Sequence, residues 1–558
     1  MKTDYPSLGR AALETLTRTT EQACRVQREQ LESILRRNAH TRYGARYSFS
    51  GIGSVQTFQQ QVPLSRYEDY EPYIQRLLAG QKAQLTQEEP VYYAITSGST
   101  GTPKYVPVTR EDMEVHYRSI YGGVFGMVQR HFPQVLSSQL FGKIWETGEF
   151  ADTRLPGGQL CGIRSASLYQ WLDRDGGFDA GDYCVPKEVL LPDTLEDLTY
   201  LKARFALAEP GITAIHSVFL HRVVRQLDYI REHWDLLLRD MAQGTVDPGV
   251  PLTDRWRQSL ARWLPADPRR AAQLRALGIE KDGANMARKI WPGLRYILGI
   301  GGEHFPQYTQ AVRRYAGDVP IHHFIYGASE GFLSIAAGVD VPDAYILLPE
   351  AGFFEFLPVE DGQTEETPRT MGEVERGKRY ELVFTNHSGL YRYRMQDVLE
   401  VVDFYGQAPV VRFCYRIHQV LNVADEKLNT EQLQAAFDAF TRQTGLEGAA
   451  FCVQEDFSTH PGRYLFYLEA APYPDAARVL DGCLCRASLG YRGCREMGDI
   501  APAAVRFVPP GSFAQYEAAL AGQGRRMAQY KPVRVLHNAW SRNFFAAQAD
   551  RMKGMKTG

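Results

Sequence analysis

The chain has 558 residues, of which 44% are hydrophobic and 23% are charged, and its formal net charge at pH 7 is −2. This length exceeds what one hydrophobic core serves, so we expect at least two domains. The near-neutral charge argues against a nucleic-acid partner, and the lack of a long apolar run argues against a membrane-spanning protein. The eight scattered cysteines and the absence of a signal-peptide core predict a cytoplasmic enzyme.

Helical periodicity opens the chain. From about Ser7 to Arg37, apolar residues recur about every 3.6 residues with polar residues between them, which predicts an amphipathic helix. An apolar run, Val91–Ile95, follows and leads directly into a stretch rich in small and hydroxyl-bearing residues.

That stretch, Thr96–Lys104, combines glycines, hydroxyl groups and one lysine. Glycines let backbone N–H groups converge on an anion, hydroxyls add donors, and Lys104 adds a point charge. The combination suits the phosphates of a nucleoside triphosphate. Its spacing differs from the G-x-x-x-x-G-K-[ST] loop of kinases and GTPases, and in isolation such a stretch is more often a polar surface turn.

Strand and helix patterns alternate through the middle of the chain, which indicates an α/β layer with parallel strands. Ligands of such sheets bind beyond the carboxyl ends of the strands, where Tyr326–Gly331 falls. Strands are predicted at Ile212–Ile215, Leu294–Ile300 and Ile321–Ile325, and helices at Phe219–Met241 and Pro306–Tyr315.

The segment Tyr326–Glu330 offers an aromatic ring that can stack on a purine and small residues that let the backbone approach a ligand. Glu330 can hold a divalent cation, because such ions prefer oxygen ligands. Taken alone, the segment is equally consistent with a sharp turn that ends in a solvated glutamate.

From about residue 353 the pattern becomes richer in strands. In Gly389–Val398 aromatic residues alternate with arginines, which predicts a strand with one polar face, and Asp397 can accept hydrogen bonds from a ribose diol. An exposed edge strand with paired charges is an equally good interpretation of that stretch alone. Short strands are predicted at Phe353–Leu357, Tyr380–Thr385, Leu390–Tyr393 and Val398–Phe404.

The rhythm changes again near residue 416. We therefore predict a large N-terminal domain over residues 1–416 and a smaller α+β domain over residues 417–558. The latter has predicted helices at Thr430–Thr441 and Pro474–Leu489 and predicted strands at Ala449–Gln454 and Tyr464–Glu469.

Together and in this order, these stretches resemble the adenylate-forming superfamily of acyl-activating enzymes. More narrowly, they resemble the auxin-responsive Gretchen Hagen 3 family of acyl-acid amido synthetases. Tyr326–Glu330 is similar to that family's Tyr-Ala-Ser-Ser-Glu block, and Thr385–Asp397 to its Thr-Thr-Tyr-Ala-Gly-Leu-Tyr-Arg-Tyr-Arg-Val-Gly-Asp block. Shorter matches extend the resemblance over nearly the whole chain, at Val62-Pro63, Tyr67–Asp69, Pro72–Ile74, Leu421–Val423 and Gln529–Lys531.

The resemblance implies an α/β fold in which mixed β-sheets flanked by helices form the large N-terminal domain and the small C-terminal domain is mobile. It also implies ATP and Mg²⁺ as cofactors. Ser97–Thr100 would grip the β- and γ-phosphates, Glu330 would meet Mg²⁺, and Lys531 would reach the α-phosphate. The implied ATP-binding residues are Thr96, Ser97, Gly98, Ser99, Thr100, Gly101, Gly301, Gly302, Tyr326, Gly327, Ala328, Ser329 and Asp397, and the implied catalytic residues are Lys531, Lys104 and Glu330.

The implied activity is that of a ligase that adenylates a carboxylic acid with release of pyrophosphate. It then transfers the acyl group to an amine, expected to be an amino acid, with release of AMP. Transfer to coenzyme A or to an alcohol stays open. So does a non-catalytic nucleotide-binding regulatory protein, because Gln396 stands where the family has glycine before the ribose-binding aspartate.

The partners implied are thus a small carboxylic acid and an amine, and the sequence carries no indication of oligomeric state. The acyl pocket is expected among helices between about residues 110 and 240. Ordinary core packing is the commoner reason for aromatic residues there. The candidates are Tyr117, Tyr121, Phe125, Phe141, Tyr169 and Trp171.

Overall fold

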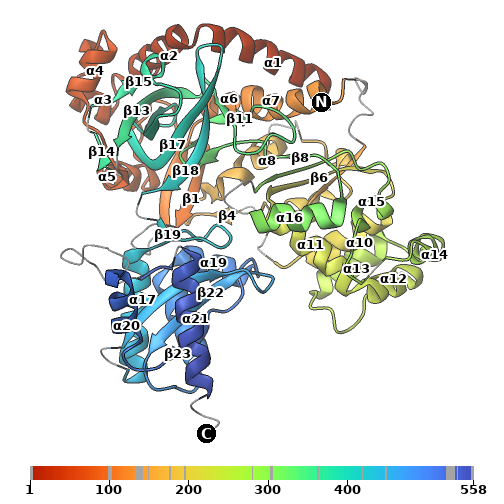
Figure 1. Cartoon of the computed structure of the whole chain (residues 1–558). Coiled ribbons are helices and arrows are strands. Elements are labelled where there is room, and N and C mark those ends of the chain that lie inside the picture. The colour runs from red at the N-terminus through yellow and green to blue at the C-terminus, as the bar shows by residue number, and fades with distance from the viewer. Residues whose placement is uncertain are drawn as a thin grey trace. The chain divides into compact units, whose positions relative to one another are not determined.

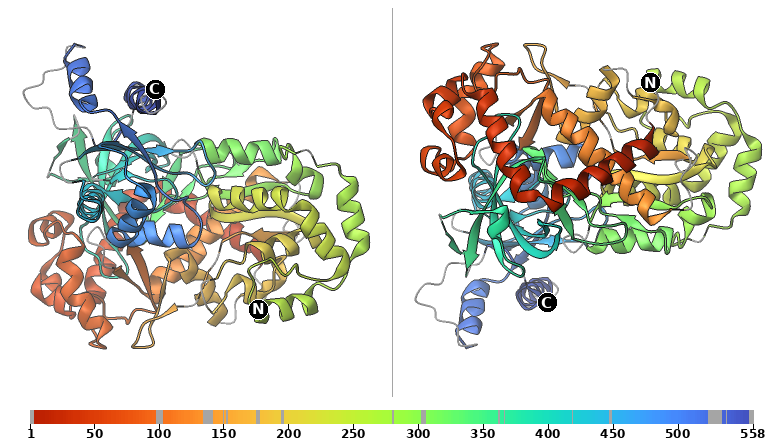
Figure 2. Two further views of the ribbon diagram at one scale, coloured as in Figure 1. Left: turned by 90° about the horizontal axis from the view of Figure 1, so that it is seen from below. Right: turned by 90° about the horizontal axis from the view of Figure 1, so that it is seen from above.

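Two consecutive helices begin the chain in the computed structural model (Figure 1). Helix α1 spans Tyr5–Glu21 and α2 spans Ala23–Asn38, whereas we predicted one continuous helical stretch. The backbone of Gln22 leaves the helical region, with φ −127° and ψ 32°. The apolar periodicity continues across this residue, so the break had no counterpart in the spacing. Seen from above, α1 and α2 run across the face of the N-terminal part (Figure 2).

The chain divides into two units, Met1–Ile95 with Tyr105–Ile417, and Thr96–Lys104 with His418–Gly558. In the described part of the chain, every helix is too short or too polar to span a lipid bilayer. The structure describes residues 4–97, 103–133, 142–148, 150–151, 153–174, 178–193, 196–279, 281–301, 306–360, 363–365, 367–417, 419–446, 449–522, 534–536 and 538–554.

A parallel sheet forms one layer of the first unit, which confirms the predicted α/β alternation. Its strand order is β3-β6-β7-β8, and each neighbouring pair is parallel. The strands are β3 (Lys143–Glu146), β6 (Ile212–Phe219), β7 (Tyr296–Ile300) and β8 (Ile321–His322). The flanking helices include α11 (Leu220–Glu232), α12 (Trp234–Gln243) and α16 (Pro306–Ala316).

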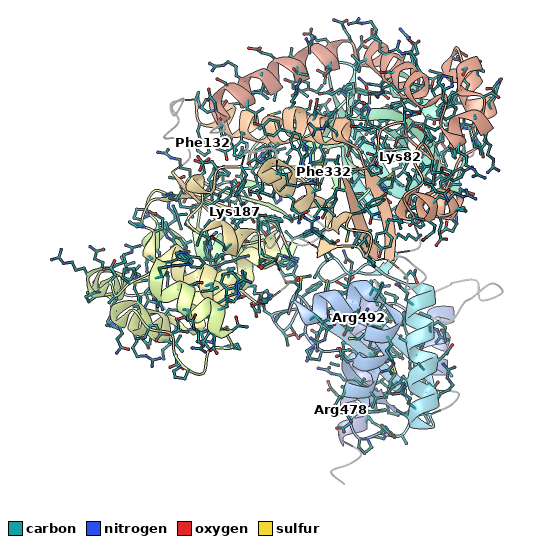
Figure 3. The ribbon with its side chains drawn as sticks, turned by 180° about the vertical axis from the view of Figure 1, so that it is seen from behind. Lys82, Phe132, Lys187, Phe332, Arg478 and Arg492 are labelled. Carbon is teal, nitrogen blue, oxygen red and sulfur yellow. The ribbon has the colours of Figure 1, made fainter. Side chains whose placement is uncertain are left out.

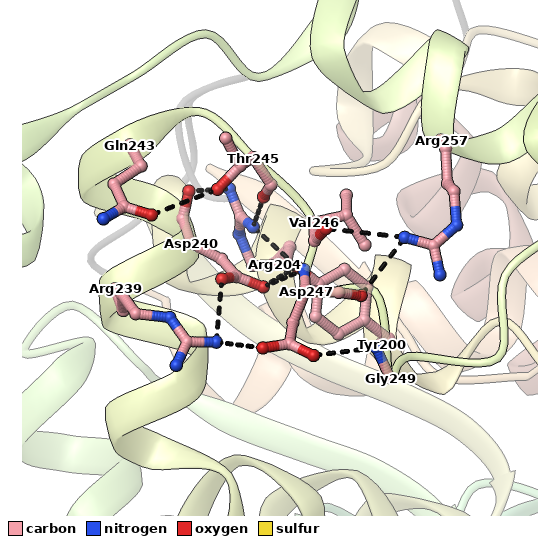
Figure 4. Close-up of polar contacts among 10 residues, drawn as sticks. All are labelled: Tyr200, Arg204, Arg239, Asp240, Gln243, Thr245, Val246, Asp247, Gly249 and Arg257. Atoms are coloured by element: carbon pink, nitrogen blue, oxygen red, sulfur yellow. Dashed lines mark hydrogen bonds and ion pairs between the residues drawn. The ribbon is translucent and has the colours of Figure 1, made fainter.

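A buried polar network fixes α12 to helix α10 (Thr199–Ala208) in this layer (Figure 4). The Tyr200 hydroxyl donates to Asp240 Oδ2 at 2.8 Å, and Arg204 donates to the Tyr200 hydroxyl at 2.7 Å. The backbone N–H of Asp247 also donates to Asp240 Oδ2, at 2.9 Å. Arg239 donates to the other carboxylate oxygen, at 3.4 Å, so three donors satisfy Asp240 within the protein, and the network serves the fold.

The second layer of the first unit is an eight-stranded antiparallel sheet of order β11-β12-β18-β17-β16-β13-β14, with β15 also paired to β13. Its strand β17 lies between two others, so the interpretation as an exposed edge strand is wrong. The strands are β11 (Ser334–Ala336), β12 (Tyr345–Leu347), β13 (Gly352–Glu360), β14 (Gln363–Thr364), β15 (Arg369–Thr370), β16 (Arg379–Asn386), β17 (Tyr393–Tyr405) and β18 (Ala408–Arg416).

The predicted strand Leu390–Tyr393 is also wrong, since only Tyr393 belongs to a strand. Arg392 has a φ of 49°, in the left-handed region. Its guanidinium is buried and donates to the carbonyl oxygens of Gln59 and Val62, both at 2.7 Å, and to the Glu355 carboxylate. The two carbonyls lie 333 and 330 residues away in the sequence, so no local pattern could reveal these contacts.

The second unit is a smaller α+β structure, as predicted. Strand β22 (Arg463–Glu469) pairs antiparallel with β21 (Ala450–Asp456) and parallel with β23 (Ala504–Val508). Helices α17 (Thr430–Thr444) and α18 (Ala476–Ala487) pack in one hydrophobic core with these strands. Both helices contribute leucine side chains to that core. The other helices are α19 (Leu489–Glu496), α20 (Ser512–Gly522) and α21 (Ala539–Gly554).

We predict that Glu355→Gln destabilises the first unit by about 3 kcal/mol or more, because it leaves the Arg392 guanidinium charged and buried without its counter-ion. Urea unfolding followed by tryptophan fluorescence measures the loss. Glu360→Gln makes the same chemical change at an exposed position of the same strand and should shift the transition little. Equal shifts for both variants would show that the buried Glu355–Arg392 pair contributes no more to the free energy of unfolding than an exposed glutamate does.

Candidate active site

The predicted block Tyr326–Glu330 lies in a tight hairpin beyond the carboxyl end of β8. Strand β9 (Gly327–Ala328) turns through residues 329–330 into β10 (Gly331–Phe332), and Phe332 pairs with Gly327. A Cβ atom on Gly327 would lie 2.6 Å from the Phe332 ring, so only glycine fits there without movement of the ring. The hairpin thus occupies the place where parallel sheets bind their ligands.

Two hydrogen bonds join this hairpin to the block that contains Asp397. The Tyr326 hydroxyl donates to Asp397 Oδ2 at 2.8 Å, across 71 residues of sequence. The Tyr393 hydroxyl donates to Glu330 Oε1 at 3.0 Å. All four side chains are buried. The structure thus brings together Asp397 and Glu330, the carboxylates that the family resemblance assigned to ribose and to Mg²⁺.

Arg416 completes this cluster and was missed by the sequence analysis. It lies directly opposite Asp397 in the pairing of β17 with β18, and its guanidinium is 3.5 Å from Asp397 Oδ1. Although burial lowers the pKa of Arg416, the carboxylates of Asp397 and Glu330 raise it above its usual value. Arg416 could not be placed from the sequence, because its position beside Asp397 depends on the register in which β17 pairs with β18.

The Tyr326 ring is packed inside the protein. It stacks on Phe413, with ring centroids 6.1 Å apart, and burial followed by the neighbouring Asp397 raises the pKa of its hydroxyl well above the usual range. Its backbone is fixed as well, since Ser334 Oγ accepts from the Tyr326 N–H and donates to its carbonyl, both at 2.9 Å. Tyr326 therefore holds Asp397 and the hairpin in a fixed relation.

Several predicted site residues are described only in part or not at all. Gly301 directly follows β7, and a Cβ atom there would lie 2.6 Å from the end of the Leu220 side chain, so only glycine fits without movement of that side chain. Thr96 and Ser97 belong to strand β1 (Tyr92–Ser97), and half-buried Lys104 belongs to β2 (Pro103–Val108), its neighbour in a four-stranded sheet. The residues outside the described part are Gly98, Ser99, Thr100, Gly101, Gly302 and Lys531.

A cavity of about 80 Å³ adjoins the hairpin within the first unit. Phe332, labelled in Figure 3, lines it, as do His116 and the carboxyl ends of the parallel strands. Of the aromatic residues considered for an acyl pocket, Tyr121, Phe125 and Tyr169 line the cavity. Phe141 lies outside the described residues, and Tyr117 and Trp171 are not among the described residues that line the cavity.

Glu146, at the end of β3, is a buried carboxylate on the wall of this otherwise largely apolar cavity. Burial raises its pKa to about 7, against the lowering effects of the Gly148 N–H, Lys202 and the Tyr169 hydroxyl. The Gly148 N–H donates to Oε1 at 2.8 Å and the Tyr169 hydroxyl donates to Oε2 at 3.3 Å. Glu146 was not among the site residues predicted from the sequence, because it lies in an ordinary short strand with no motif around it.

The histidines of the cavity are neutral at physiological pH. Burial lowers the pKa of His216 to about 3, and its Nε2 lies 2.9 Å from the Tyr296 hydroxyl. Burial and the nearby Arg164 lower the pKa of His116 well below its usual value. Within the described residues, no group of three or more His, Cys, Asp or Glu side chains is arranged to hold a metal ion.

Comparison with protein families covers most of the chain. The GH3 family N-terminal domain matches residues 12–321, the central domain residues 345–416 and the C-terminal domain residues 431–539. The chain belongs to the GH3 family. The resemblance inferred from the three sequence blocks is thereby confirmed.

Curated GH3 relatives align along nearly their whole length. A jasmonoyl–L-amino acid synthetase, GH3.5 of Oryza sativa subsp. japonica, is 28% identical over 549 residues, 93% of either chain. An indole-3-acetic acid-amido synthetase, GH3.10 of Arabidopsis thaliana, is 26% identical over 564 residues, which covers 93% of this chain and 94% of the relative.

Solved structures confirm the predicted fold class. The acyl acid amido synthetase AtGH3.15 in complex with 2,4-DB has a TM-score of 0.66 and 23% identity, over 97% of this chain and 96% of its own. A 2-hydroxyisobutyryl-CoA ligase in complex with 2-HIB-AMP and CoA has a TM-score of 0.51 and 12% identity, over 96% and 92%. The fold is the α/β fold of adenylate-forming enzymes, with a large N-terminal and a small C-terminal domain.

The departure at Gln396 is accommodated by this GH3 protein. Gln396 takes a φ of 60°, in the left-handed region that favours glycine, at a cost of about 1 kcal/mol. Its carbonyl accepts a hydrogen bond from the Ile417 N–H at 2.7 Å, and the next residue, Asp397, remains bonded to Tyr326. Within β17, Gln396 therefore holds a left-handed backbone conformation of the kind that glycine adopts readily.

We predict that Glu146→Gln becomes more stable relative to the native chain as pH rises from 5 to 8. The folded-state pKa of Glu146 is raised to about 7 from 4.5, so the native state holds a proton that the unfolded state has released. The free energy of unfolding of the native chain therefore falls across this window, by on the order of 2 kcal/mol, whereas glutamine does not titrate.

Urea unfolding at pH 5, 6.5 and 8, followed by tryptophan fluorescence, measures this difference. Trp540 is the only one of the seven tryptophans beyond residue 417, so the signal reports mainly on the first unit. A stability difference between the two proteins that is independent of pH would show that Glu146 ionises as an ordinary glutamate.

Proposed function

We propose that this GH3 protein is an ATP-dependent ligase that adenylates a carboxylic acid and transfers the acyl group to an amino acid. The observation that carries the proposal is the pair of hydrogen bonds, Tyr326 to Asp397 and Tyr393 to Glu330, which join two distant family blocks in one buried cluster. The two relatives that align along 93% of the chain are named as a jasmonoyl–L-amino acid synthetase and an indole-3-acetic acid-amido synthetase.

The cluster suits the ribose and the metal that accompany ATP. Asp397, held by Tyr326 and Arg416, would accept from the ribose hydroxyls, and the backbone of Gly327-Ala328 would approach the adenine. Glu330 fits a Mg²⁺ ion as a lone protein carboxylate, because Mg²⁺ usually binds one or two carboxylates together with substrate phosphates. When bound, the ion neutralises charge on the phosphates.

The phosphate and adenine contacts proposed from the sequence complete the site. The glycine- and hydroxyl-rich loop and Lys104 would hold the β- and γ-phosphates, and Lys531 would approach the α-phosphate. The proposed nucleotide-binding residues of this loop are Thr96, Ser97, Gly98, Ser99, Thr100 and Gly101. The remaining ones are Gly301, Gly302 and Ser329.

The proposed reaction has two steps. A carboxylate oxygen of the acid attacks the α-phosphorus of ATP and pyrophosphate leaves, which gives the acyl-adenylate. The amine nitrogen then attacks the acyl carbon, AMP leaves with the bonding electrons, and the nitrogen loses a proton. Positive charge near the α-phosphate and the leaving pyrophosphate lowers the barrier of the first step, which is the role proposed for Lys104 and Lys531.

We further propose that residues 417–558 form a mobile lid on the N-terminal domain of residues 1–416, since closure of such lids excludes water and completes catalytic sites. Cytoplasmic localisation is proposed from the scattered spacing of the eight cysteines.

Adenylation should fail when Lys531 is removed. Lys531→Ala takes away one charge-stabilising donor, and such losses typically cost about 3 kcal/mol, a hundredfold or more in rate. Acid-dependent pyrophosphate release should fall by that factor, while ATP binding measured by calorimetry changes little. Arg478→Ala, which removes a positive charge from an exposed site on the same unit, should leave the rate unchanged. Near-normal pyrophosphate release by Lys531→Ala would remove this lysine from the mechanism.

The decisive test of the function is a screen of carboxylic acids for acid-dependent pyrophosphate release. The best acid is then incubated with ATP and, in separate reactions, amino acids, coenzyme A or alcohols. AMP release that requires an amino acid, with an amide as product, supports the proposal. A thioester or ester product would replace the second step, and the absence of any acid-dependent pyrophosphate release would favour a non-catalytic nucleotide-binding protein.

A further inference from the structure

The cavity runs along the carboxyl edge of the parallel sheet. Its wall includes Glu146 at the end of β3, the end of β6, Leu298 of β7 and the residues that follow β8. The strand order places β3 and β8 at opposite edges, three strand spacings or roughly 14 Å apart. Phe332, which pairs with Gly327, lies at the end of the cavity beside the proposed nucleotide site, so Glu146 belongs to the opposite edge.

The cavity wall is apolar apart from a few buried polar groups. Ser217 Oγ and His116 Nδ1 both lie on this wall and have no hydrogen-bond partner among the described residues. Ser217 is 2% exposed and His116 is 8% exposed. Buried polar atoms without partners are uncommon in folded proteins, and a bound ligand is one way to satisfy them.

Glu146 has acceptor capacity to spare. A carboxylate offers about four lone-pair directions, and the Gly148 N–H and the Tyr169 hydroxyl occupy two of them. The bond from Tyr169 is long, at 3.3 Å. Lys202 is committed elsewhere, because its ammonium donates to the carbonyl oxygens of Gly148 and Thr147, at 2.5 and 3.3 Å. A further donor would offset part of the cost of burying this carboxylate.

Position and chemistry together define what such a ligand must carry. The carboxyl group of an acid awaiting adenylation must face the nucleotide, at the Phe332 end. Its remote end then lies toward the outer strand β3, where the acceptor Glu146 sits beside His216, its partner in the pairing of β3 with β6. A purely apolar acid would supply no further hydrogen-bond donor to Glu146.

We propose that Glu146 is a specificity-determining residue that accepts a hydrogen bond from a hydroxyl or N–H group at the end of the acid remote from its carboxyl group. The inference rests on the proposed adenylation of an acid at this site. The cavity, of about 80 Å³, is lined mainly by apolar side chains, with Glu146 as an acceptor on its wall. The substrate class is therefore an apolar short-chain or single-ring acid with a distal hydrogen-bond donor.

Matched pairs of acids test this assignment. The pairs are hexanoate with 6-hydroxyhexanoate, and phenylacetate with 4-hydroxyphenylacetate. At pH 8, above the pKa of about 7 to which burial raises Glu146, the side chain is ionised. We expect the native chain at this pH to favour the hydroxylated member of at least one pair by tenfold or more in kcat/KM for pyrophosphate release, the range for hydrogen bonds to charged groups. Glu146→Met keeps a side chain of similar length without acceptors and should abolish or invert the preference.

Two controls guard against effects on folding. Glu146→Gln keeps one acceptor oxygen and should show an intermediate preference, and near-ultraviolet circular dichroism checks that each variant is folded. Glu188→Met makes the same chemical change as Glu146→Met at an exposed position of the first unit and should behave as the native chain does. An unchanged preference in folded Glu146→Met would overturn the assignment.

Binding of the same acids, measured by calorimetry, separates the inference from the proposed function. A hydroxyl preference in binding that Glu146→Met removes, without pyrophosphate release from any acid, would support the recognition by Glu146 and overturn the adenylation. Equal pyrophosphate release from both members of each pair would support adenylation and overturn the role of Glu146. If the native chain neither binds nor turns over any of the four acids, the assigned substrate class is wrong.

Discussion

The hydrogen bond from Tyr326 to Asp397 joins the parallel sheet and the large antiparallel sheet of the first unit. Tyr326 follows the last strand of the parallel sheet, and Asp397 lies in a central strand of the antiparallel sheet. Because both groups are buried, a partner lost on either side would leave a polar group unsatisfied, which costs more than an ordinary hydrogen bond contributes. The register of β17 with β18 then adds Arg416 beside Asp397, and the bond from Tyr393 holds Glu330. These contacts together position the proposed ribose and metal ligands.

Within its described residues the large sheet buries three carboxylates, and each is paired with an arginine. They are Glu355, Glu381 and Asp397. Arg394 donates to Glu381 at 2.6 and 2.9 Å, as Arg392 does to Glu355 at 3.0 Å. Such pairs add little net stability compared with apolar side chains, but they strongly penalise any arrangement that separates the partners. They therefore fix the register of β16 and β17, on which the position of Asp397 depends.

Local patterns predicted much of the fold and about half of the site. The parallel strands, the small α+β unit and the two family blocks follow from periodicity and from short runs of characteristic residues. What was missed depends on distant partners. Arg392 leaves the strand because carbonyls near residue 60 accept from its side chain, and Arg416 joins the site through strand register. Glu146 has no motif at all, and only the sheet order places it on a cavity beside the nucleotide site.

Both proposed substrates thus bind at the carboxyl ends of the strands of one parallel sheet. In parallel sheets all strands end at the same edge, so a nucleotide site beyond β8 and a pocket beyond β3 are neighbours without any special arrangement of loops. The glycine at position 327 lets the hairpin fold back onto Phe332, which separates the two regions. A carboxylate at the far end of such a pocket has a consequence for selectivity. Apolar contacts discriminate weakly between acids of similar size, whereas a buried acceptor penalises every acid that fails to supply a donor.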